Sequence, residues 1–208
     1  MLDDFPNVFV ISDEIYERIT YDAEHVSFAA LPNQFQRTIT INGFSKSHSM
    51  TGYRLGYCAA PIDIIKACGK IQSQMTSSAS SVSQFAGNVA LTEVDESWME
   101  ERVKELKEKR DLAFSLVSKI PHLSCPLPVG AFYLLPNVSH YFHKKTLAGR
   151  TVSNSHEMCL ELLREEKVAL VSGDAFGAPD TLRVSYAASK ELITESVTRL
   201  EKFLLSLQ

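Results

Sequence analysis

The amino-acid sequence predicts an α/β protein with two domains, and three features of the chain support this fold class. The first half contains short apolar runs of strand length, followed by segments with helical periodicity. A long amphipathic and strongly charged segment lies near the middle, and after Pro121 the pattern alternates between strand and helix. A chain of 208 residues with 45% hydrophobic residues can form one large domain or two small ones with a proper core.

The first part of the chain predicts three strands and then two helices. The strand candidates are apolar or β-branched runs that end near turn residues, namely "NVFVI" (7–11), "TITIN" (38–42) and "YRLGYCAA" (53–60). Because these runs are unbroken, we expect strands that are covered on both faces. From Ile62 to about Val94 the pattern is helical, and the small residues "TSSASS" indicate a junction between two helices.

The middle segment predicts a long connecting helix over residues 96–120. Its charged residues are dense, and we interpret them as a solvent-exposed face. The apolar residues on the other face recur at helical spacing and are Met99, Val103, Leu106, Ala113 and Leu116.

Residues 121–208 predict a second, smaller α/β domain. The expected strands are "GAFYLL", "VALVS" and "TLRVSYAA", and the expected helices are "SHEMCLELLREE" and "ELITESVTRLEKFLLSL". Ser189 is the expected N-cap of the last helix. The residues that this helix is expected to bury on one side are Leu192, Val197, Leu200 and Phe203.

Composition excludes several classes of partner. A formal net charge of −4 and a pI near 5.9 provide no basic surface, so we expect no nucleic-acid partner. No apolar run approaches the roughly 18–20 residues of a membrane span, so we expect no membrane insertion. The N-terminus "MLDDFPN" resembles neither a secretion signal nor a transit peptide. The expected location is the cytoplasm, with organelle targeting as an open alternative.

The cysteines predict no metal site and no disulfide framework. The four cysteines lie too far apart in the sequence for a zinc or redox motif, and they are too few for a fold that disulfide bonds stabilise. We expect reduced, mostly buried thiols at Cys58, Cys68, Cys125 and Cys159.

The stretch "NGFSKSHSMTGYRLG" (42–56) carries the main chemical signal. A lone lysine is usually a solvated charge, but Lys46 follows a predicted strand within a run of small residues. Such a neighbourhood could partly desolvate the amine, which lowers its pKa and favours the neutral form that Schiff-base chemistry requires. We therefore infer a carbonyl cofactor. Arg54, between Gly52 and Gly56, could bind a phosphate on that cofactor or could form an ordinary ion pair.

Two further residues near the start of the chain are candidates. Asp13 closes the first predicted strand, where a carboxylate is either a cap for the next turn or a functional acid. Tyr16 follows three residues later and could share one side of a helical turn with Asp13.

Together these segments resemble a known family. "GFSKSHSMTGYRLG" resembles the pyridoxal-phosphate attachment signature of class I aminotransferases, with an arginine eight positions after the lysine, and "SDEIY" (12–16) resembles the cofactor-ring motif of the same family. "GAFYL", "GDAFG" and "LRVSYA" resemble its small-domain landmarks. The sequences of these segments are most similar to those of the prokaryotic-type aspartate and prephenate aminotransferases. The resemblance implies pyridoxal 5'-phosphate as cofactor and the fold of the type I transferases, with a mostly parallel sheet in the large domain.

The resemblance also implies a role for each candidate residue. Lys46 would hold the cofactor and act as the general base, and Asp13 would pair with the pyridine nitrogen. Tyr16 would bind the phenolic oxygen of the ring, and Arg54 would bind the phosphate. Arg183 would bind the α-carboxylate of the substrate. Strand alternation independently places Arg183 on the face opposite its two neighbours Leu182 and Val184.

Some positions depart from the family pattern. Ser45 is a further candidate phosphate contact. The family often has a phosphate-binding serine three residues before the lysine, where this chain has Gly43. Ser172 stands where a proline commonly precedes "GDAFG". His48 is compatible with the signature, and packing or capping is its expected role.

The chain resembles only the C-terminal half of such an enzyme, because "SDEIY" begins at residue 12. The implied organisation is the end of the cofactor-binding large domain at 1–95, a connecting helix at 96–120 and the small domain at 121–208. Half of a sheet would leave an edge and a large apolar surface exposed. We expect the isolated chain to bind the cofactor weakly and to turn over little.

The leading hypothesis is transamination between an amino acid, aspartate or glutamate, and a 2-oxo acid. An aromatic or prephenate aminotransferase is the nearest alternative. A different class is a noncatalytic truncated fragment that acts as a dimerisation module, since the full-length form of the family is a homodimer. A serine hydrolase, suggested by Ser45 and His48, has little support because no "GxSxG" motif is present.

Overall fold

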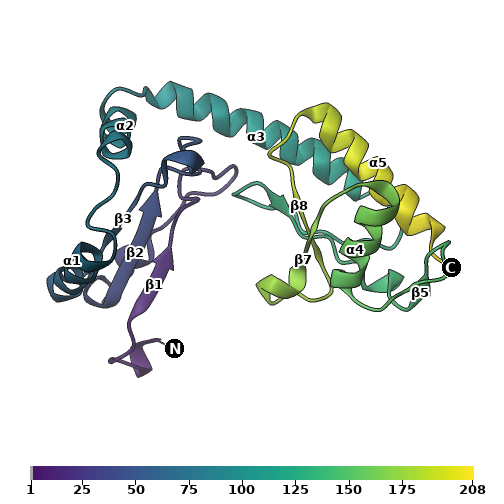
Figure 1. The fold of residues 1–208 in the computed structure, drawn as a ribbon, viewed down its shortest axis with the longest axis horizontal. Helices are drawn as coiled ribbons and strands as arrows, with labels where there is room; N and C mark the ends of the chain where they lie inside the picture. The colour runs from purple at the N-terminus through teal and green to yellow at the C-terminus, as the bar shows by residue number, and fades with distance from the viewer. Residues whose placement is uncertain (1) are drawn as a thin grey trace. The chain divides into compact units, whose positions relative to one another are not determined.

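The computed structural model describes residues 2–208, apart from the side chain of Asp3 (Figure 1). The chain divides into two units, of which the first ends at Val103 and the second is Lys104–Gln208. The boundary lies inside one long helix, α3 (Glu96–Val117). Both units combine helices with strands, so the predicted α/β fold class is confirmed. The predicted division at residues 95 and 120 stays a prediction.

The first unit contains one three-stranded sheet in the order β1-β2-β3 (Figure 1). β1 (Val10–Asp13) pairs in parallel with β2 (Thr38–Gly43), and β3 (Gly56–Ala59) pairs antiparallel with β2. The long connection from β1 to β2 contains only turns and the short 3-10 helices η2 (Phe28–Ala30) and η3 (Phe35–Arg37). The described part of the sheet is therefore mixed, not mostly parallel.

The three predicted strands and two predicted helices of this unit are confirmed with different strand bounds. β1 begins three residues later than predicted and ends at Asp13, and β2 extends one residue further, to Gly43. β3 begins at Gly56 instead of at Tyr53, because the short helix η4 (Thr51–Tyr53) and a left-handed Arg54 precede it. The helices are α1 (Ile62–Met75) and α2 (Ser81–Thr92), and the serine-rich segment joins them as expected.

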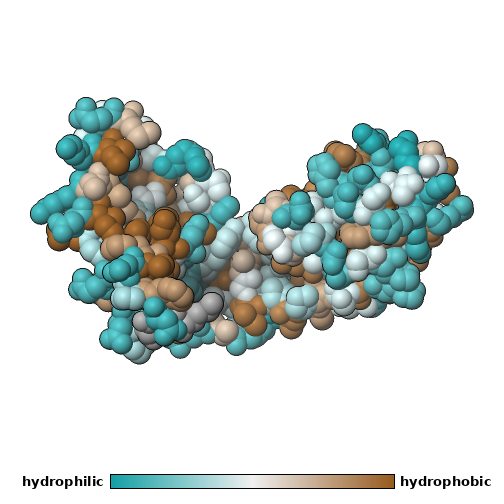
Figure 2. Space-filling view, turned by 90° about the horizontal axis from the view of Figure 1, so that it is seen from below, coloured by the Kyte–Doolittle hydropathy of each residue, from teal (hydrophilic) through white to brown (hydrophobic). Residues whose placement is uncertain are grey.

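The strands of the first unit are not covered on both faces within residues 2–208, which corrects that expectation. Ile11 in β1 is 68% exposed, every residue of β3 is exposed, and α1 buries none of its residues. Figure 2 shows hydrophobic residues gathered on the visible face of this unit. The expected exposure of apolar surface is therefore present in the chain.

The predicted solvated face of α3 requires one correction, at Arg110. This side chain is only 2% exposed. Its Nη2 lies 2.7 Å from a carboxylate oxygen of Asp111, and its Nη1 donates to the carbonyl oxygen of Pro128 at 3.0 Å. The guanidinium can be buried because charged and polar partners satisfy its donors. Met99 and Ala113 are buried as expected.

The second unit contains a small antiparallel sheet in the order β4-β8-β7 (Figure 1). β8 (Leu182–Ser185) is the central strand, between β4 (Tyr133–Leu134) and β7 (Val171–Ser172). The two helices α4 (Ser155–Glu166) and α5 (Lys190–Ser206) contact each other. The hairpin formed by β5 (Lys144–Lys145), β6 (Thr151–Val152) and their turn was not predicted.

The helices of the second unit begin where polar side chains cap them. Ser189 Oγ accepts a hydrogen bond from Leu192 N at 3.2 Å, which confirms the predicted N-cap of α5. Leu192 itself is 60% exposed, so its predicted burial is wrong, and Ile193 is buried in its place. The predicted burial of Val197, Leu200 and Phe203 is confirmed, and Ile193 continues their helical spacing at the start of α5.

The four cysteines are free thiols, as expected, but their predicted burial is wrong. Cys58 and Cys68 are exposed, and Cys125 and Cys159 are half-buried. Burial raises the pKa of the Cys159 thiol to about 11. Among the described residues, every helix is too short or too polar to cross a membrane.

Candidate functional site

The candidate residues of the first unit lie where three strand ends meet at one edge of the sheet. Asp13 is the last residue of β1 and is aligned with Ile41 of β2, so the carboxyl ends of both parallel strands lie at the same edge. β3 begins at this edge, because Gly56 is aligned with Gly43. The turn that carries Lys46 and the residues before β3 therefore both adjoin Asp13. Functional residues commonly lie at the carboxyl ends of parallel strands.

Lys46 occupies a tight turn directly after β2. The amide of His48 donates to the carbonyl oxygen of Phe44 at 3.1 Å, and Met50 N donates to the same oxygen at 3.3 Å. The Phe44 ring is buried in a small core that also contains Met50 and Ala90. Ser45 and Lys46, at the centre of this turn, are half-buried. The buried ring anchors the turn, and the lysine is not a fully solvated surface charge.

Position 43 requires a glycine for a structural reason that sequence reasoning missed. A Cβ atom at this position would lie 2.9 Å from the carbonyl oxygen of Leu55 and 3.0 Å from the Cα of Gly56. Both contacts are with backbone, which cannot move aside without disturbing the sheet. The glycine therefore lets the end of β2 and the start of β3 approach closely, beside the turn that carries Lys46.

Arg54 lies at the opposite end of this loop, just before β3. Its backbone is in the left-handed region with φ 53°, which is unusual for a residue with a side chain. Its Nη1 donates to the carbonyl oxygen of Thr51 at 2.9 Å, and the side chain is otherwise exposed. Within residues 2–208 Arg54 forms no ion pair, so the alternative of a strand-end ion pair has no support there.

Asp13 and Tyr16 lie on the segment that follows β1. The Asp13 carboxylate accepts a hydrogen bond from Ile15 N at 3.2 Å, so the residue does cap the turn after the strand. Its side chain remains exposed at the sheet edge. Tyr16 is half-buried in the same turn, where its carbonyl oxygen accepts a hydrogen bond from Ile19 N at 2.9 Å.

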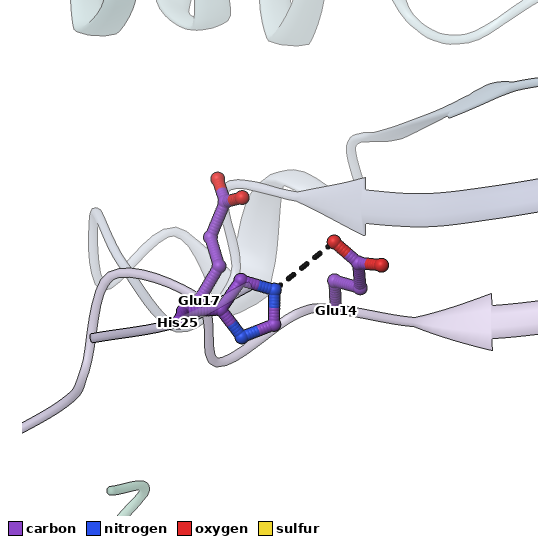
Figure 3. Close-up of side chains that lie close together, drawn as sticks. All are labelled: Glu14, Glu17 and His25. Atoms are coloured by element: carbon purple, nitrogen blue, oxygen red, sulfur yellow. Dashed lines mark hydrogen bonds and ion pairs between the residues drawn. The ribbon is translucent and has the colours of Figure 1, made fainter. Parts of the chain in front are cut away.

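Glu14, which sequence reasoning did not single out, fixes this segment to the strand. Its side chain is 4% exposed, and Oε1 accepts hydrogen bonds from Ser12 Oγ, Ser27 Oγ and Phe28 N at 2.9–3.0 Å. Oε2 lies 3.1 Å from His25 Nε2 (Figure 3). Burial alone would raise the pKa of Glu14, but the hydrogen bonds from His25, Phe28, Ser12 and Ser27 together lower it.

Glu14, Glu17 and His25 offer potential ligand atoms within 4.8 Å of one another. In Figure 3 a dashed line joins His25 to Glu14, and Glu17 is joined to neither. The carboxylate of Glu14 already accepts hydrogen bonds from several protein donors. We therefore interpret the cluster of three residues as part of an internal hydrogen-bond network and not as a metal site. The signal available in the sequence was only that an acidic pair follows the first strand.

His48 has the packing role expected for it. Its ring stacks on Trp98 with centroids 6.4 Å apart, and it contacts Phe44 at 5.6 Å. Burial and the nearby Arg18 charge lower the pKa of His48. The hydroxyl beside its Nδ1 is that of Ser47, at 2.8 Å, and not that of Ser45. His48 and Trp98 also line an apolar pocket of about 420 Å³.

Arg183 belongs to the second unit, at the second position of β8. Leu182 and Val184 are buried and Arg183 is half-buried, so the predicted alternation along this strand is confirmed. Tyr186 is also buried. Arg183 is therefore held on the face of the small sheet opposite the core.

Comparison with known proteins identifies the class. Residues 3–200 match the profile of the family described as "Aminotransferase class I and II". An aspartate aminotransferase from Pinus pinaster is 44% identical over 206 residues, which are 98% of this chain and 42% of that protein. The bifunctional aspartate aminotransferase and glutamate/aspartate-prephenate aminotransferase of Petunia hybrida is also 44% identical, over 98% of this chain and 43% of that protein.

A solved structure supports the same conclusion. The aspartate aminotransferase from Rhizobium meliloti superposes with a TM-score of 0.93 at 36% identity and covers 100% of this chain and 52% of that one. The chain belongs to the class I and II aminotransferase family. It spans about half the length of the relatives it matches.

Proposed function

We propose that this chain is the part of a pyridoxal-phosphate-dependent aminotransferase that holds the cofactor ring and the substrate carboxylate. The observation that carries the proposal is the meeting of Asp13, Lys46 and Arg54 at one edge of the first sheet. Membership of the family supports the class of reaction. The residue roles below extend from this family to the matching positions of this chain.

The residues present fit pyridoxal phosphate chemically. The sheet edge offers an amine for the aldehyde, a carboxylate for the ring nitrogen and a guanidinium for the phosphate. The missing Cβ of Gly43 supports this fit, because it allows the two strand ends that carry Lys46 and Arg54 to lie close together. When bound, pyridoxal phosphate supplies an aldehyde that condenses with amines and a ring that accepts electrons from the substrate Cα.

Each side chain then has a simple task. Lys46 tethers the cofactor and, once released, its Nζ removes the proton from the substrate Cα as a general base. Asp13 keeps the ring nitrogen protonated, and Tyr16 donates a hydrogen bond to the phenolic oxygen of the ring. Arg54 binds the phosphate, with Ser45 as an additional contact. Arg183 binds the α-carboxylate and thereby orients the Cα–H bond.

The proposed substrates are aspartate or glutamate together with a 2-oxo acid. The names of the Pinus pinaster and Petunia hybrida relatives support this class, and the second name also supports prephenate as an alternative acceptor. We propose a homodimer for the full-length form. A noncatalytic fragment that serves as a dimerisation module is the second candidate, which the exposed apolar surface of the first unit favours.

Covalent trapping tests the cofactor assignment on the chain as it exists. The 208-residue protein is incubated with pyridoxal phosphate, reduced with borohydride and mapped by mass spectrometry. We expect Lys46 to be labelled faster than Lys66 and Lys70, which are exposed lysines of the same unit. Arg54→Met is expected to slow labelling of Lys46 by at least about tenfold through loss of a charge-assisted contact.

The two exposed lysines are the internal control, because their labelling should not change in Arg54→Met. Arg54→Lys keeps the charge and is expected to recover part of the Lys46 labelling. Labelling of Lys46 at the rate of Lys70, with no dependence on Arg54, would contradict the proposed cofactor site. That result would favour the noncatalytic alternative.

A further inference from the structure

The guanidinium of Arg183 lies over two aromatic rings of the second unit. Its Cζ atom is 4.5 Å from the centroid of the Tyr133 ring and 4.3 Å from that of the Phe176 ring. Both distances are well within the range of cation–π contacts. Arginine stacks on aromatic faces through the plane of its guanidinium, which leaves the N–H groups at the edge of that plane available.

The two rings come from the two sides of β8. Tyr133 lies in β4, where it is aligned with Ser185, on one side of the central strand. Phe176 lies in the 3-10 helix η6 (Gly173–Phe176), which directly follows β7 on the other side. The fold therefore supplies one ring from each neighbour of the strand that carries Arg183.

The loop that carries Phe176 is tightly built. A Cβ atom at Gly173 would lie 2.0 Å from Thr181 Oγ1 and 2.3 Å from the carbonyl oxygen of Ala178. Gly177 has φ +71°, a conformation that glycine adopts without strain. Ser172 Oγ accepts a hydrogen bond from Asp174 N at 3.2 Å and so caps η6. The segment "GDAFG" thus folds into a loop whose glycines fix the position of the Phe176 ring.

The edge of the guanidinium has no protein partner in the described part of the chain. Among residues 2–208, the Arg183 side chain makes these ring contacts but no hydrogen bond and no ion pair. A half-buried arginine with unused donors is suited to accept a planar anion through two parallel hydrogen bonds. Stacking restricts the rotation of the side chain, so less conformational entropy is lost when the anion binds.

We propose that Tyr133 and Phe176 are positioning residues that hold the Arg183 guanidinium ready for a substrate carboxylate. This inference rests on the proposed role of Arg183 as the carboxylate-binding residue. It assigns a function to the "GDAFG" segment and to the tyrosine of "GAFYL", neither of which has a role in the cofactor chemistry described above.

Nuclear magnetic resonance of the full chain tests the inference. The Nε–Hε signal of Arg183 is identified by its loss in Arg183→Lys and is followed during titration with L-aspartate. In the unchanged chain we expect ring currents to shift this signal upfield and hydrogen bonding to the carboxylate of L-aspartate to shift it downfield. We expect Phe176→Leu and Tyr133→Leu each to remove part of the ring-current shift and to weaken L-aspartate binding by about three- to tenfold.

Conservative variants and a matched control separate positioning from general stability. Phe176→Tyr and Tyr133→Phe keep a ring and are expected to bind L-aspartate as the unchanged chain does. Phe142→Leu, at a half-buried phenylalanine of the same unit, is expected to leave both the signal and the affinity unchanged.

The outcomes distinguish this inference from the proposed function. If the unchanged chain responds to L-aspartate and the two leucine variants bind it equally well, the rings have no positioning role and the inference is overturned. An equal loss of affinity in Phe142→Leu would also overturn it, because the effect would be general. If the Arg183 signal does not respond to L-aspartate in any form of the chain, the proposed carboxylate role of Arg183 is wrong.

Discussion

Glu14 is the residue on which the segment after β1 depends most strongly. Its carboxylate accepts hydrogen bonds from Ser12, Ser27 and the amide of Phe28, and it contacts His25. We predict that Glu14→Ala destabilises the first unit by about 2–3 kcal/mol, because several donors lose their shared acceptor. Urea unfolding followed by circular dichroism measures this loss.

A control for Glu14 lies three residues further along the chain. Glu17, whose side chain no dashed line joins to Glu14 or His25 in Figure 3, is half-buried in the same turn. Glu17→Ala is expected to change the free energy of unfolding by less than about 0.5 kcal/mol. Equal effects of the two substitutions would mean that the hydrogen bonds of Glu14 contribute little.

The lowered pKa of Glu14 predicts a pH dependence of stability. Because the pKa is lower in the folded protein than its value of 4.5 in the unfolded chain, the folded state favours the ionised carboxylate. The stabilisation is present above pH 4.5 and is lost as the pH falls through the lower, folded pKa. Unfolding free energies measured between pH 7 and acid should decline less steeply in Glu14→Gln. An identical decline in both proteins would exclude this contribution.

At the scale of the element, two glycines inside helices predict opposite effects of the same substitution. Gly69 lies within α1, where a Cβ atom would meet nothing within 4 Å, whereas a Cβ at Gly87 in α2 would lie 2.4 Å from Leu55 Cδ2 and 3.4 Å from Phe44 Cε2. We predict that Gly69→Ala stabilises the first unit by about 0.5–1 kcal/mol through the better helix propensity of alanine. We predict that Gly87→Ala destabilises it by about 1 kcal/mol through overpacking.

The two variants are each other's control, because both change glycine to alanine inside a helix of the same unit. Their unfolding free energies are measured under one set of conditions with denaturant. If Gly87→Ala stabilises as much as Gly69→Ala, Leu55 moves aside without cost, and the close packing of α2 on the turn that carries Lys46 is not rigid.

At the scale of the whole molecule, the first unit exposes apolar surface. Phe35 is 71% exposed, and Ile62, which lines the same surface pocket of about 310 Å³, is 64% exposed. Exposed apolar patches of this kind mark interaction surfaces. The chain spans about half the length of the relatives it matches.

This exposure predicts binding of the dye ANS by the folded chain. Phe35→Ser should lower ANS fluorescence, because it removes a ring from the pocket while changing stability by no more than about 0.5 kcal/mol. Leu147→Ser is the control, since Leu147 is 73% exposed in the second unit, outside this pocket. Fluorescence titration measures both variants. An equal decrease in the two would show that ANS does not report on the surface of the first unit.

The sequence alone determined the order of the main strands and helices and the candidate residues of the site. Strand runs, helical periodicity and the N-cap Ser189 are local patterns, and the motif around Lys46 carries its spacing within a few residues. The family follows from these motifs and is confirmed. For the same reason the prediction of Arg183 as outward-facing is confirmed, since alternation along one strand is a local property.

Only the tertiary structure decided which residues meet. The buried Arg110 depends on a carbonyl from a later segment, and the network of Glu14 depends on donors from a distant turn. The rings over Arg183 come from two different neighbours of its strand. The exact inward face of α5 also followed from packing, with Ile193 in place of Leu192. These facts escape a sequence pattern because periodicity describes one element, whereas burial and hydrogen bonding depend on the elements against which it packs.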